Sequence, residues 1–410
     1  MNKVIGMIPS RMSSSRFPGK ALALILGKPM IYWVYKQARK VKEFDEIHVA
    51  TADKEIKECC DKYEIPCICN LTNETTAAQK IALEAESLDG DIYVNIQGDE
   101  PLIEPEAIRQ IINEMVDDSN LDYVGLKSKI TTKEEYFDRN VVKVVTDENN
   151  YAMYFSRSPI PYNYDGNNAY RVMGLYGYRK DFLKNFLNGT RGKLEESECG
   201  VEMLRVMEKG YKIKLLDTNY QSIGVDLKEH IELVEEKMIA KGTYGEYTDL
   251  YDENKNLIGE KMFREKGTKL EVPEGKYNIV VLAFIENSKG EFLFQMTSKR
   301  KKSVWATTGG HVKSGQTSEQ AILEEIKEEL GIEIEPTEIE LFKTYKYESA
   351  FKDVFYIRKD IDINKLVYDE DEVEYVQYLT REEIMDLINN DGNIRKTNID
   401  AFLDIIENKN

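Results

Sequence analysis

The sequence is poor in the side chains that most often serve as metal ligands and proton carriers, with only 3 histidines and 5 cysteines in 410 residues. The chain therefore has few histidines for acid–base catalysis, and we expect carboxylates, arginines and lysines to carry the chemistry. Four cysteines lie close together, Cys59, Cys60, Cys67 and Cys69. Their spacing lacks the two C-x-x-C pairs of a typical zinc site, and Cys67-Ile68-Cys69 fits alternate faces of a short strand instead.

Long apolar runs are also absent, since no stretch approaches the roughly 20 residues that span a bilayer. The apolar stretch Val4–Ile8 is too short for a secretory signal, so we expect a cytoplasmic protein. The formal net charge of −18 argues against general binding to nucleic acid or an anionic membrane, because both need a basic surface. The length favours two or three domains.

A basic loop follows the first predicted strand, Lys3–Ile8. Three cations lie among small hydroxyl residues in this loop: Arg11, Arg16 and Lys20. Arginine forks, a lysine charge and hydroxyl donors can converge on the oxygens of a triphosphate. A solvated basic loop is the alternative. The P-loop pattern G-x-x-x-x-G-K-[ST] is absent, which excludes the standard nucleotide-triphosphatase fold.

The segment Asp91–Pro101, DIYVNIQGDEP, predicts a buried parallel strand that ends abruptly. Gly98 allows a sharp turn and Pro101 stops the strand from continuing. A carboxylate at the carboxyl end of such a strand lies where open α/β sheets bind ligands, so Asp99 is placed to hold a divalent cation over a polyphosphate. An acidic turn without a ligand is the alternative.

Strands and helices alternate through the first half of the chain, which indicates a three-layer α/β sheet. The predicted strands after the first are Glu46–Thr51, Ile65–Cys69 and the Asp91 strand, and the predicted helices are Ile31–Val41, Asp53–Tyr63, Thr76–Ser87 and Leu227–Ala240.

Several motifs over about residues 1–238 resemble, in the same order, those of the CMP-KDO synthetases, cytidylyltransferases that activate the acid sugar 3-deoxy-manno-octulosonate. The motifs are Arg11–Lys20, Gln97–Pro101, Asn140–Val145, Tyr154–Pro161, Gly174–Arg179, Leu204–Ile213 and Gly224–Asp226.

This resemblance implies a Rossmann-like nucleotidyltransferase domain over residues 1–240, with CTP as substrate and Mg²⁺ as cofactor. It also implies a homodimer, which composition does not test. Asp99 and Asp226 would ligate the metal, and two distant carboxylates agree with what a hard cation shared with phosphate needs. The residues implied to bind the nucleotide are Arg11, Ser14, Arg16, Lys20 and Gln97, and those implied to act in transfer are Arg11, Lys20, Asp99 and Asp226.

The sequence departs from the family pattern on the side expected to face the acceptor. Thr75–Lys80 lacks the family's arginine, Val172 replaces a histidine, and Met203 replaces the glutamine of a Glu-Gln pair. The phosphate and metal positions are kept while these have changed, which favours cytidylyl transfer to a different acceptor, such as another acid sugar or a phosphonate. A wrong alignment across Thr75 is the alternative, and an ordinary CMP-KDO synthetase is the runner-up function.

A second unit is predicted over residues 246–410, after a short join at Lys241–Gly245. It is expected to be α+β, with a hairpin over Glu246–Ile258 and strands over Tyr277–Ile285 and Glu291–Met296. A helix is expected over Thr317–Leu330, with Thr317 or Ser318 as its cap.

Glu325, Glu328 and Glu329 fall at i, i+3 and i+4 on one face of that helix. Like charges this close repel unless a cation lies among them, so they are candidate Mg²⁺ ligands; a solvated acidic face is the alternative.

Residues Gly310–Ile332 resemble the Nudix box, whose glutamates bind metal for hydrolysis of nucleoside diphosphates linked to another group. The box's first glutamate is Gln316 here and its arginine is Glu324. The metal-binding core survives, with Glu325 and Glu328 as the implied catalytic pair. The predicted function is a bifunctional cytidylyltransferase and Nudix hydrolase, and the two departures motivate an alternative in which the second unit is a non-catalytic sensor.

Overall fold

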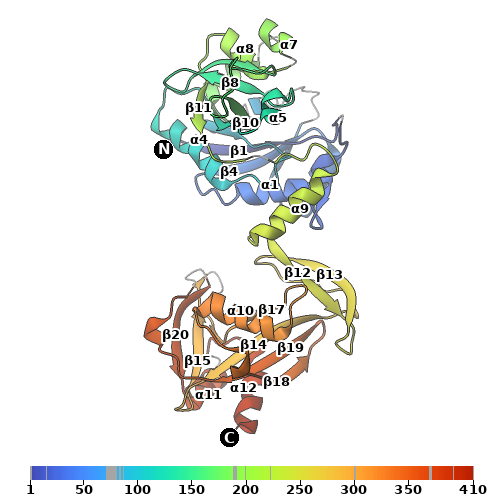
Figure 1. Ribbon diagram of the computed structural model, residues 1–410, viewed down its shortest axis with the longest axis vertical. Helices are drawn as coiled ribbons and strands as arrows, with labels where there is room; N and C mark the ends of the chain where they lie inside the picture. The colour runs from blue at the N-terminus through green and yellow to red at the C-terminus, as the bar shows by residue number, and fades with distance from the viewer. Residues whose placement is uncertain are drawn as a thin grey trace. The chain divides into compact units, whose positions relative to one another are not determined.

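The computed structural model describes residues 2–14, 16–70, 81–82, 85, 87–187, 192–198, 200–221, 223–299, 302–368, 372–390 and 392–409. The chain divides into two compact units, Met1–Ala240 and Lys241–Asn410. Figure 1 labels many of their helices and strands. The departure at Thr75–Lys80 lies outside the described residues, as does most of the helix predicted over Thr76–Ser87.

A sheet of nine described strands forms the centre of the first unit (Figure 1), in the order β11-β7-β10-β6-β1-β4-β5, with β8 and β9 attached through β10. β1 pairs in parallel with β4 and β6, whereas β10 is antiparallel to both of its neighbours β6 and β7. The strands are β1 Val4–Pro9, β4 Glu46–Thr51, β5 Cys67–Cys69, β6 Ile92–Asn95, β7 Tyr123–Lys129, β8 Lys143–Thr146, β9 Ala152–Ser156, β10 Tyr170–Arg179 and β11 Lys214–Asp217, and a separate pair is β2 Leu24–Ile25 with β3 Lys28–Pro29.

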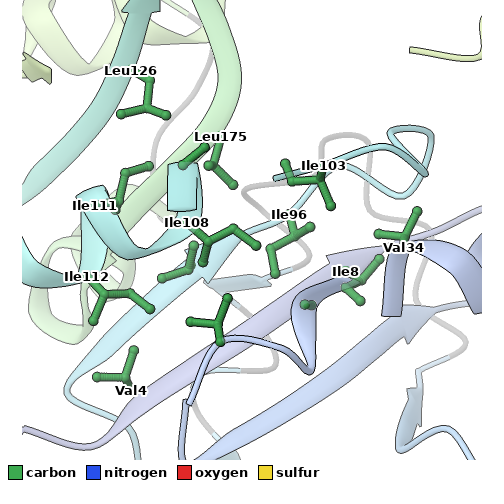
Figure 2. Close-up of a cluster of buried hydrophobic side chains, with 14 of the residues drawn as sticks. Val4, Ile8, Val34, Ile96, Ile103, Ile108, Ile111, Ile112, Leu126 and Leu175 are labelled. Atoms are coloured by element: carbon green, nitrogen blue, oxygen red, sulfur yellow. The ribbon is translucent and has the colours of Figure 1, made fainter. Parts of the chain in front are cut away.

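Successive side chains of each strand point to opposite sides of the sheet, so both faces are apolar and both are covered by helices. Val4 and Ile8 of β1 pack in one cluster with residues of α1 and α4, as Figure 2 shows, whereas Ile5 and Met7 pack in another with residues of α6 and α8. Each fully buried isoleucine of this kind contributes about 1.5–3 kcal/mol. The helices are α1 Met30–Ala38, α2 Lys54–Lys62, α4 Pro105–Asp117, α5 Lys133–Phe137, α6 Lys180–Leu187, α7 Lys193–Ser197, α8 Glu202–Glu208, α9 His230–Lys241 and the 3₁₀ turn η1 Lys20–Leu22.

The predicted parallel strand before Asp99 is confirmed, since β6 is fully buried and pairs in parallel with β1. β4 has the predicted bounds. β5 begins at Cys67 instead of Ile65, because Pro66 has no N–H to donate to the ladder.

The second unit contains a mixed sheet of seven described strands and a separate hairpin, β12–β13. β14 lies in the sheet's centre, where Ile279, Val281 and Ala283 face α10 and the alternate residues Leu282 and Phe284 face α11 and α12. The elements are β12 Gly245–Tyr251, β13 Leu257–Glu265, β14 Asn278–Glu286, β15 Phe292–Thr297, β16 Trp305–Ala306, β17 Gly309–His311, α10 Ser318–Leu330, η3 Pro336–Glu338, β18 Ile339–Lys346, β19 Ala350–Arg358, η4 Ile363–Lys365, β20 Val373–Leu379, α11 Arg381–Asn389 and α12 Lys396–Asn408.

The helix predicted from Thr317 is confirmed as α10, with a capping box in which the Thr317 hydroxyl accepts from Gln320 N. Gly331 ends the helix in a left-handed conformation, φ 67°. Among the residues described, no helix is both long enough and apolar enough to cross a membrane.

Candidate functional site

The first candidate site lies where β1 and β6 end, at the carboxyl edge of the parallel strands. The chain can turn there because residue 98 is a glycine: a Cβ at Gly98 would lie 2.6 Å from Ser10 Oγ and 2.8 Å from the Pro9 carbonyl oxygen. The Val225 N–H donates to the Asp99 carbonyl at 2.9 Å, which ties the segment before α9 to this turn. The backbone thus brings Asp99 and Asp226 to one place.

Two cations from the basic loop lie against these two carboxylates. Lys20 Nζ is 2.5 Å from Asp99 Oδ2 and 3.5 Å from Asp226 Oδ1, and Arg16 Nη2 is 2.9 Å from Asp226 Oδ1. The side chain of Lys20 is 19% exposed and that of Asp99 is 28% exposed, so these charges are only partly screened by water. The cluster concentrates both signs of charge at the edge where α/β sheets bind ligands.

The other residues predicted to bind nucleotide form no ion pair or side-chain hydrogen bond with this cluster among the residues that the structure describes. Arg11 is exposed, and within the described residues it forms no ion pair with either aspartate. Ser14 Oγ accepts a hydrogen bond from Phe17 N at 3.4 Å, a contact inside the loop. Gln97 is half-buried beside β10, where a Cβ at Gly174 would lie 2.9 Å from Gln97 Cγ.

Two of the positions predicted to face the acceptor share one apolar cluster. Met203 is buried in the cluster that also contains Phe155 and Leu204, and Val172 packs against it. The neighbouring Glu202 accepts a hydrogen bond from the buried Arg205 at 2.7 Å. Two positions that are polar in the family therefore contribute only apolar surface here.

Sequence reasoning missed two polar groups near these positions, one fully buried and one half-buried. Lys143 is fully buried and donates to three carbonyl oxygens, those of Asp138, Val141 and Arg157, at 2.7–2.8 Å. Burial lowers its pKa. Glu198 accepts hydrogen bonds from Ser156 Oγ and Arg157 N. The position of Lys143 inside the otherwise apolar run Val141–Val145 could have indicated that this lysine is buried.

The second candidate site lies where β17 meets α10. Gly310 is required there, because a Cβ at this position would lie 1.9 Å from Glu325 Oε1. Burial, together with the charges of Glu329, Glu328 and Glu246, raises the pKa of Glu325 to about 7. Glu329 is buried and accepts a hydrogen bond from Gln295 Nε2 at 3.0 Å. The three predicted glutamates are thus close enough to repel one another.

The two departures from the Nudix box contact each other. Gln316 Nε2 donates to Glu324 Oε2. Lys313 Nζ lies 2.7 Å from Glu324 Oε1 and 3.6 Å from Glu328 Oε1. Gln316 and Glu324 therefore stand where the box has glutamate and arginine, and Lys313 from the preceding loop supplies the positive charge. The hydrogen bonds from Lys313 and Gln316 lower the pKa of Glu324.

Both sites have donor sets that suit a divalent cation. In the first, carboxylate oxygens of Asp99 and Asp226 are the ligands that Mg²⁺ prefers, and Lys20 and Arg16 together balance their two negative charges. In the second, burial and then the neighbouring glutamate charges raise the pKa of Glu325, and a bound cation would offset both effects. In the described part of the chain no three His, Cys, Asp or Glu side chains converge in a metal-binding arrangement, so the predicted ligands stay predictions.

A cavity of about 380 Å³ lies elsewhere in the second unit, on the α11 side, and contains none of the predicted site residues. It is lined by Trp305, Gln377, Leu379, Glu383, Asp386, Leu387, Asn390 and Gly392.

Comparison with known proteins agrees with this architecture. Residues 5–213 match the Cytidylyltransferase family and residues 276–400 match the NUDIX domain. The 3-deoxy-manno-octulosonate cytidylyltransferase of Geotalea uraniireducens is 41% identical over 249 residues, which is 58% of this chain and 99% of the relative. The enzyme of the same name from Fusobacterium nucleatum is 44% identical over 235 residues, covering 57% and 95%.

A solved structure of CMP:2-keto-3-deoxy-manno-octonic acid synthetase complexed with CTP superposes on 58% of this chain and 98% of its own, with a TM-score of 0.55 and 33% identity. The first unit is therefore a nucleotidyltransferase with a Rossmann-like α/β fold. More narrowly, the chain belongs to the cytidylyltransferase family, with a CMP-KDO synthetase-like first domain followed by a Nudix domain. The predicted families and fold class are confirmed.

Proposed function

We propose that residues 1–240 transfer a cytidylyl group from CTP to an anionic acceptor, and that residues 246–410 hydrolyse a nucleotide derivative. The observation that carries the first half is the cluster of Lys20, Arg16, Asp99 and Asp226 at the carboxyl edge of the sheet. The relatives are named as 3-deoxy-manno-octulosonate cytidylyltransferases and the related structure holds CTP, which supports CTP as the donor.

In transfer, an acceptor oxygen attacks the α-phosphorus of CTP and the bond to the bridging oxygen breaks, so that pyrophosphate leaves. Mg²⁺ held by Asp99 and Asp226 would supply charge neutralisation on the phosphates. Lys20 and Arg16, released from these carboxylates, would bind phosphate oxygens. Arg11 and Ser14 of the basic loop and Gln97, which follows β6, would complete the nucleotide site. The protein contributes position and charge, without a covalent intermediate.

The acceptor is proposed to be an acid sugar or phosphonate other than 3-deoxy-manno-octulosonate. The apolar surface of Val172 and Met203 supports this, since two polar partners for a sugar are missing. The second candidate is an ordinary CMP-KDO synthetase, which the identity of 41–44% to enzymes of that name favours. Efficient turnover of 3-deoxy-manno-octulosonate by the full chain would establish the second candidate.

The metal assignment is tested by Asp99→Ala and Asp226→Ala, each expected to abolish pyrophosphate release while circular dichroism stays unchanged. Asp89→Ala is the matched control, because that side chain is fully exposed and pairs only loosely with Lys180. Normal release by either of the first two variants would overturn the assignment.

For the second unit, the proposed chemistry is Mg²⁺-dependent cleavage of a diphosphate, with Glu325, Glu328 and Glu329 as the metal ligands. The replacement of the Glu–Arg pair by Gln316, Glu324 and Lys313 supports an intact site, because the polar contact and its charge balance are retained. The alternative is a non-catalytic sensor.

Screening nucleoside diphosphate derivatives against the full chain separates hydrolase from sensor. Brisk turnover by the native chain supports the hydrolase if Glu328→Gln abolishes it and the exposed control Glu319→Gln does not. Absence of turnover across the panel supports the sensor. The CMP-linked product of the first unit belongs in that panel.

A further inference from the structure

We propose that Arg264 binds the phosphate groups of the hydrolase substrate and that Glu246 positions it, so that the hairpin β12–β13 is part of the active site of the second unit. This rests on the hydrolase function proposed for residues 246–410. The hairpin lies outside the residues that match the NUDIX domain, 276–400, and neither residue was among the predicted site residues.

The hairpin is attached beside the candidate site by its backbone. Ser314 N donates to the Tyr247 carbonyl at 2.7 Å, and Thr248 Oγ1 donates to the Val312 carbonyl at 2.9 Å. Asp249 accepts from Ser314 Oγ and Gly315 N at 2.6 and 2.8 Å. β12 therefore runs along the loop that carries the start of the Nudix box.

A second attachment lies at the turn of the hairpin. Lys255 Nζ contacts both oxygens of the buried Asp353, at 2.5 and 2.7 Å, and Thr344 Oγ1 donates to the same carboxylate. Buried ion pairs with additional hydrogen bonds fix geometry more firmly than exposed ones do. The hairpin is thus held at both ends against the core of its own unit.

The side chains of the hairpin alternate between two faces, and Glu246 and Arg264 share the face of the buried Thr248. These two residues are direct cross-strand partners, as are Thr248 and Met262. Tyr247 and Phe263 pack edge to face on the other face.

Glu246 and Arg264 both influence groups of the Nudix box. The charge of Glu246 raises the pKa of both Glu325 and Lys313. His311 has its pKa lowered to about 4, first by burial and then by the charge of Arg264. The pair therefore lies within electrostatic range of β17 and α10.

The geometry of the pair leaves donors for a ligand. Arg264 Nε and Nη2 both donate to Glu246 Oε1, at 3.2 and 2.5 Å. A guanidinium has five N–H donors. Among the described residues the other three have no protein acceptor, and the side chain is only 22% exposed. A half-buried arginine fork fixed by a carboxylate matches a phosphate group.

Charge balance favours the same assignment. Glu246, Glu324, Glu325, Glu328 and Glu329 gather at this end of the domain. A diphosphate brought there would be repelled unless cations stood between them. Lys313 is paired with Glu324 and Arg264 with Glu246, so each cation is held in place by a glutamate. Arg264 keeps a planar set of N–H donors that matches a phosphate group, which favours it as the group that receives the ligand.

The test is binding of α,β-methylene-CDP to the full chain with Mg²⁺, measured by calorimetry in a Lys20→Ala background that weakens the phosphate site of the first unit. Arg264→Met is expected to raise the Kd about tenfold or more, and Arg264→Lys by an intermediate factor because the fork is lost. Lys261→Met is the matched control, since Lys261 lies on the same strand over the Tyr247 ring, on the opposite face. Equal affinity in Arg264→Met and the control, or no binding by the background protein, would overturn the proposal.

Glu246→Gln separates positioning from metal binding. We expect a severalfold rise in Kd and KM with kcat and Mn²⁺ affinity unchanged, whereas loss of Mn²⁺ affinity would make Glu246 a metal ligand and refute its positioning role. If no nucleotide is hydrolysed but analogue binding still depends on Arg264, the phosphate site stands and the hydrolase function fails.

Discussion

Glu325→Gln is predicted to stabilise the metal-free second unit at high pH. In the folded protein burial and three nearby glutamates raise the pKa of Glu325 from 4.5 to about 7. A tenfold change in a proton-binding constant corresponds to ~1.4 kcal/mol, so keeping this carboxylate ionised costs the folded unit ~3 kcal/mol at pH 8. Glutamine has the same shape and no charge, and the substitution removes that cost.

The pH dependence follows from the sign of this change. Below pH 4.5 the carboxyl is protonated in both the folded and the unfolded chain, so the substitution has little effect. Between pH 4.5 and 7 the unfolded chain releases the proton first, and the stability of the native protein falls. The stability difference between variant and native protein should therefore rise from near zero at pH 4.5 to ~3 kcal/mol above pH 7.

Urea unfolding in EDTA measures this difference. The chain has 2 tryptophans, Trp33 in the first unit and Trp305 in the second, so a Trp33→Phe background makes fluorescence report on the second unit alone. Glu319→Gln, an exposed change on the same helix, should shift stability by less than ~0.5 kcal/mol. A destabilised Glu325→Gln variant at pH 8, or a difference independent of pH, would refute the reasoning.

Three further outcomes are expected. Gly98→Ala should destabilise the first unit by ~1–3 kcal/mol in thermal unfolding and reduce CTP turnover, because the new Cβ meets Ser10 Oγ; an unchanged variant would contradict the close approach. Lys143→Met should cost ~2–4 kcal/mol in urea unfolding by leaving three carbonyl oxygens without the donor that they have in the folded protein. Because the pKa of His311 is lowered to about 4, kcat/KM of the hydrolase should show no histidine limb near pH 6.5, and a limb removed by His311→Gln would contradict this.

Strong local signals explain why much of the fold is predictable. β6 has an uninterrupted buried run that ends at a glycine turn, and α10 has a threonine cap and a terminal glycine. The order of strands in the sheet cannot be predicted in this way, because hydrophobic periodicity does not specify which strands are neighbours. The sequence does not reveal that β10 inserts antiparallel between β6 and β7.

The same limit applies to the sites. Asp99 and Asp226 could be named individually, but their sharing of one Lys20 ammonium depends on loop conformations. The role proposed for Arg264 could not be predicted from the Nudix box, because this residue lies outside it. Only the register of the hairpin, which pairs Arg264 with Glu246, indicates that the two side chains meet.

The most direct test of the central claim is pyrophosphate release by the full chain from each of the four nucleoside triphosphates, with Mg²⁺ and a panel of acid sugars and phosphonates. The account predicts release with CTP alone, dependent on one anionic acceptor and lost in Asp99→Ala. No release from CTP with any acceptor by folded protein that binds CTP, or equal release from all four nucleotides, would contradict it.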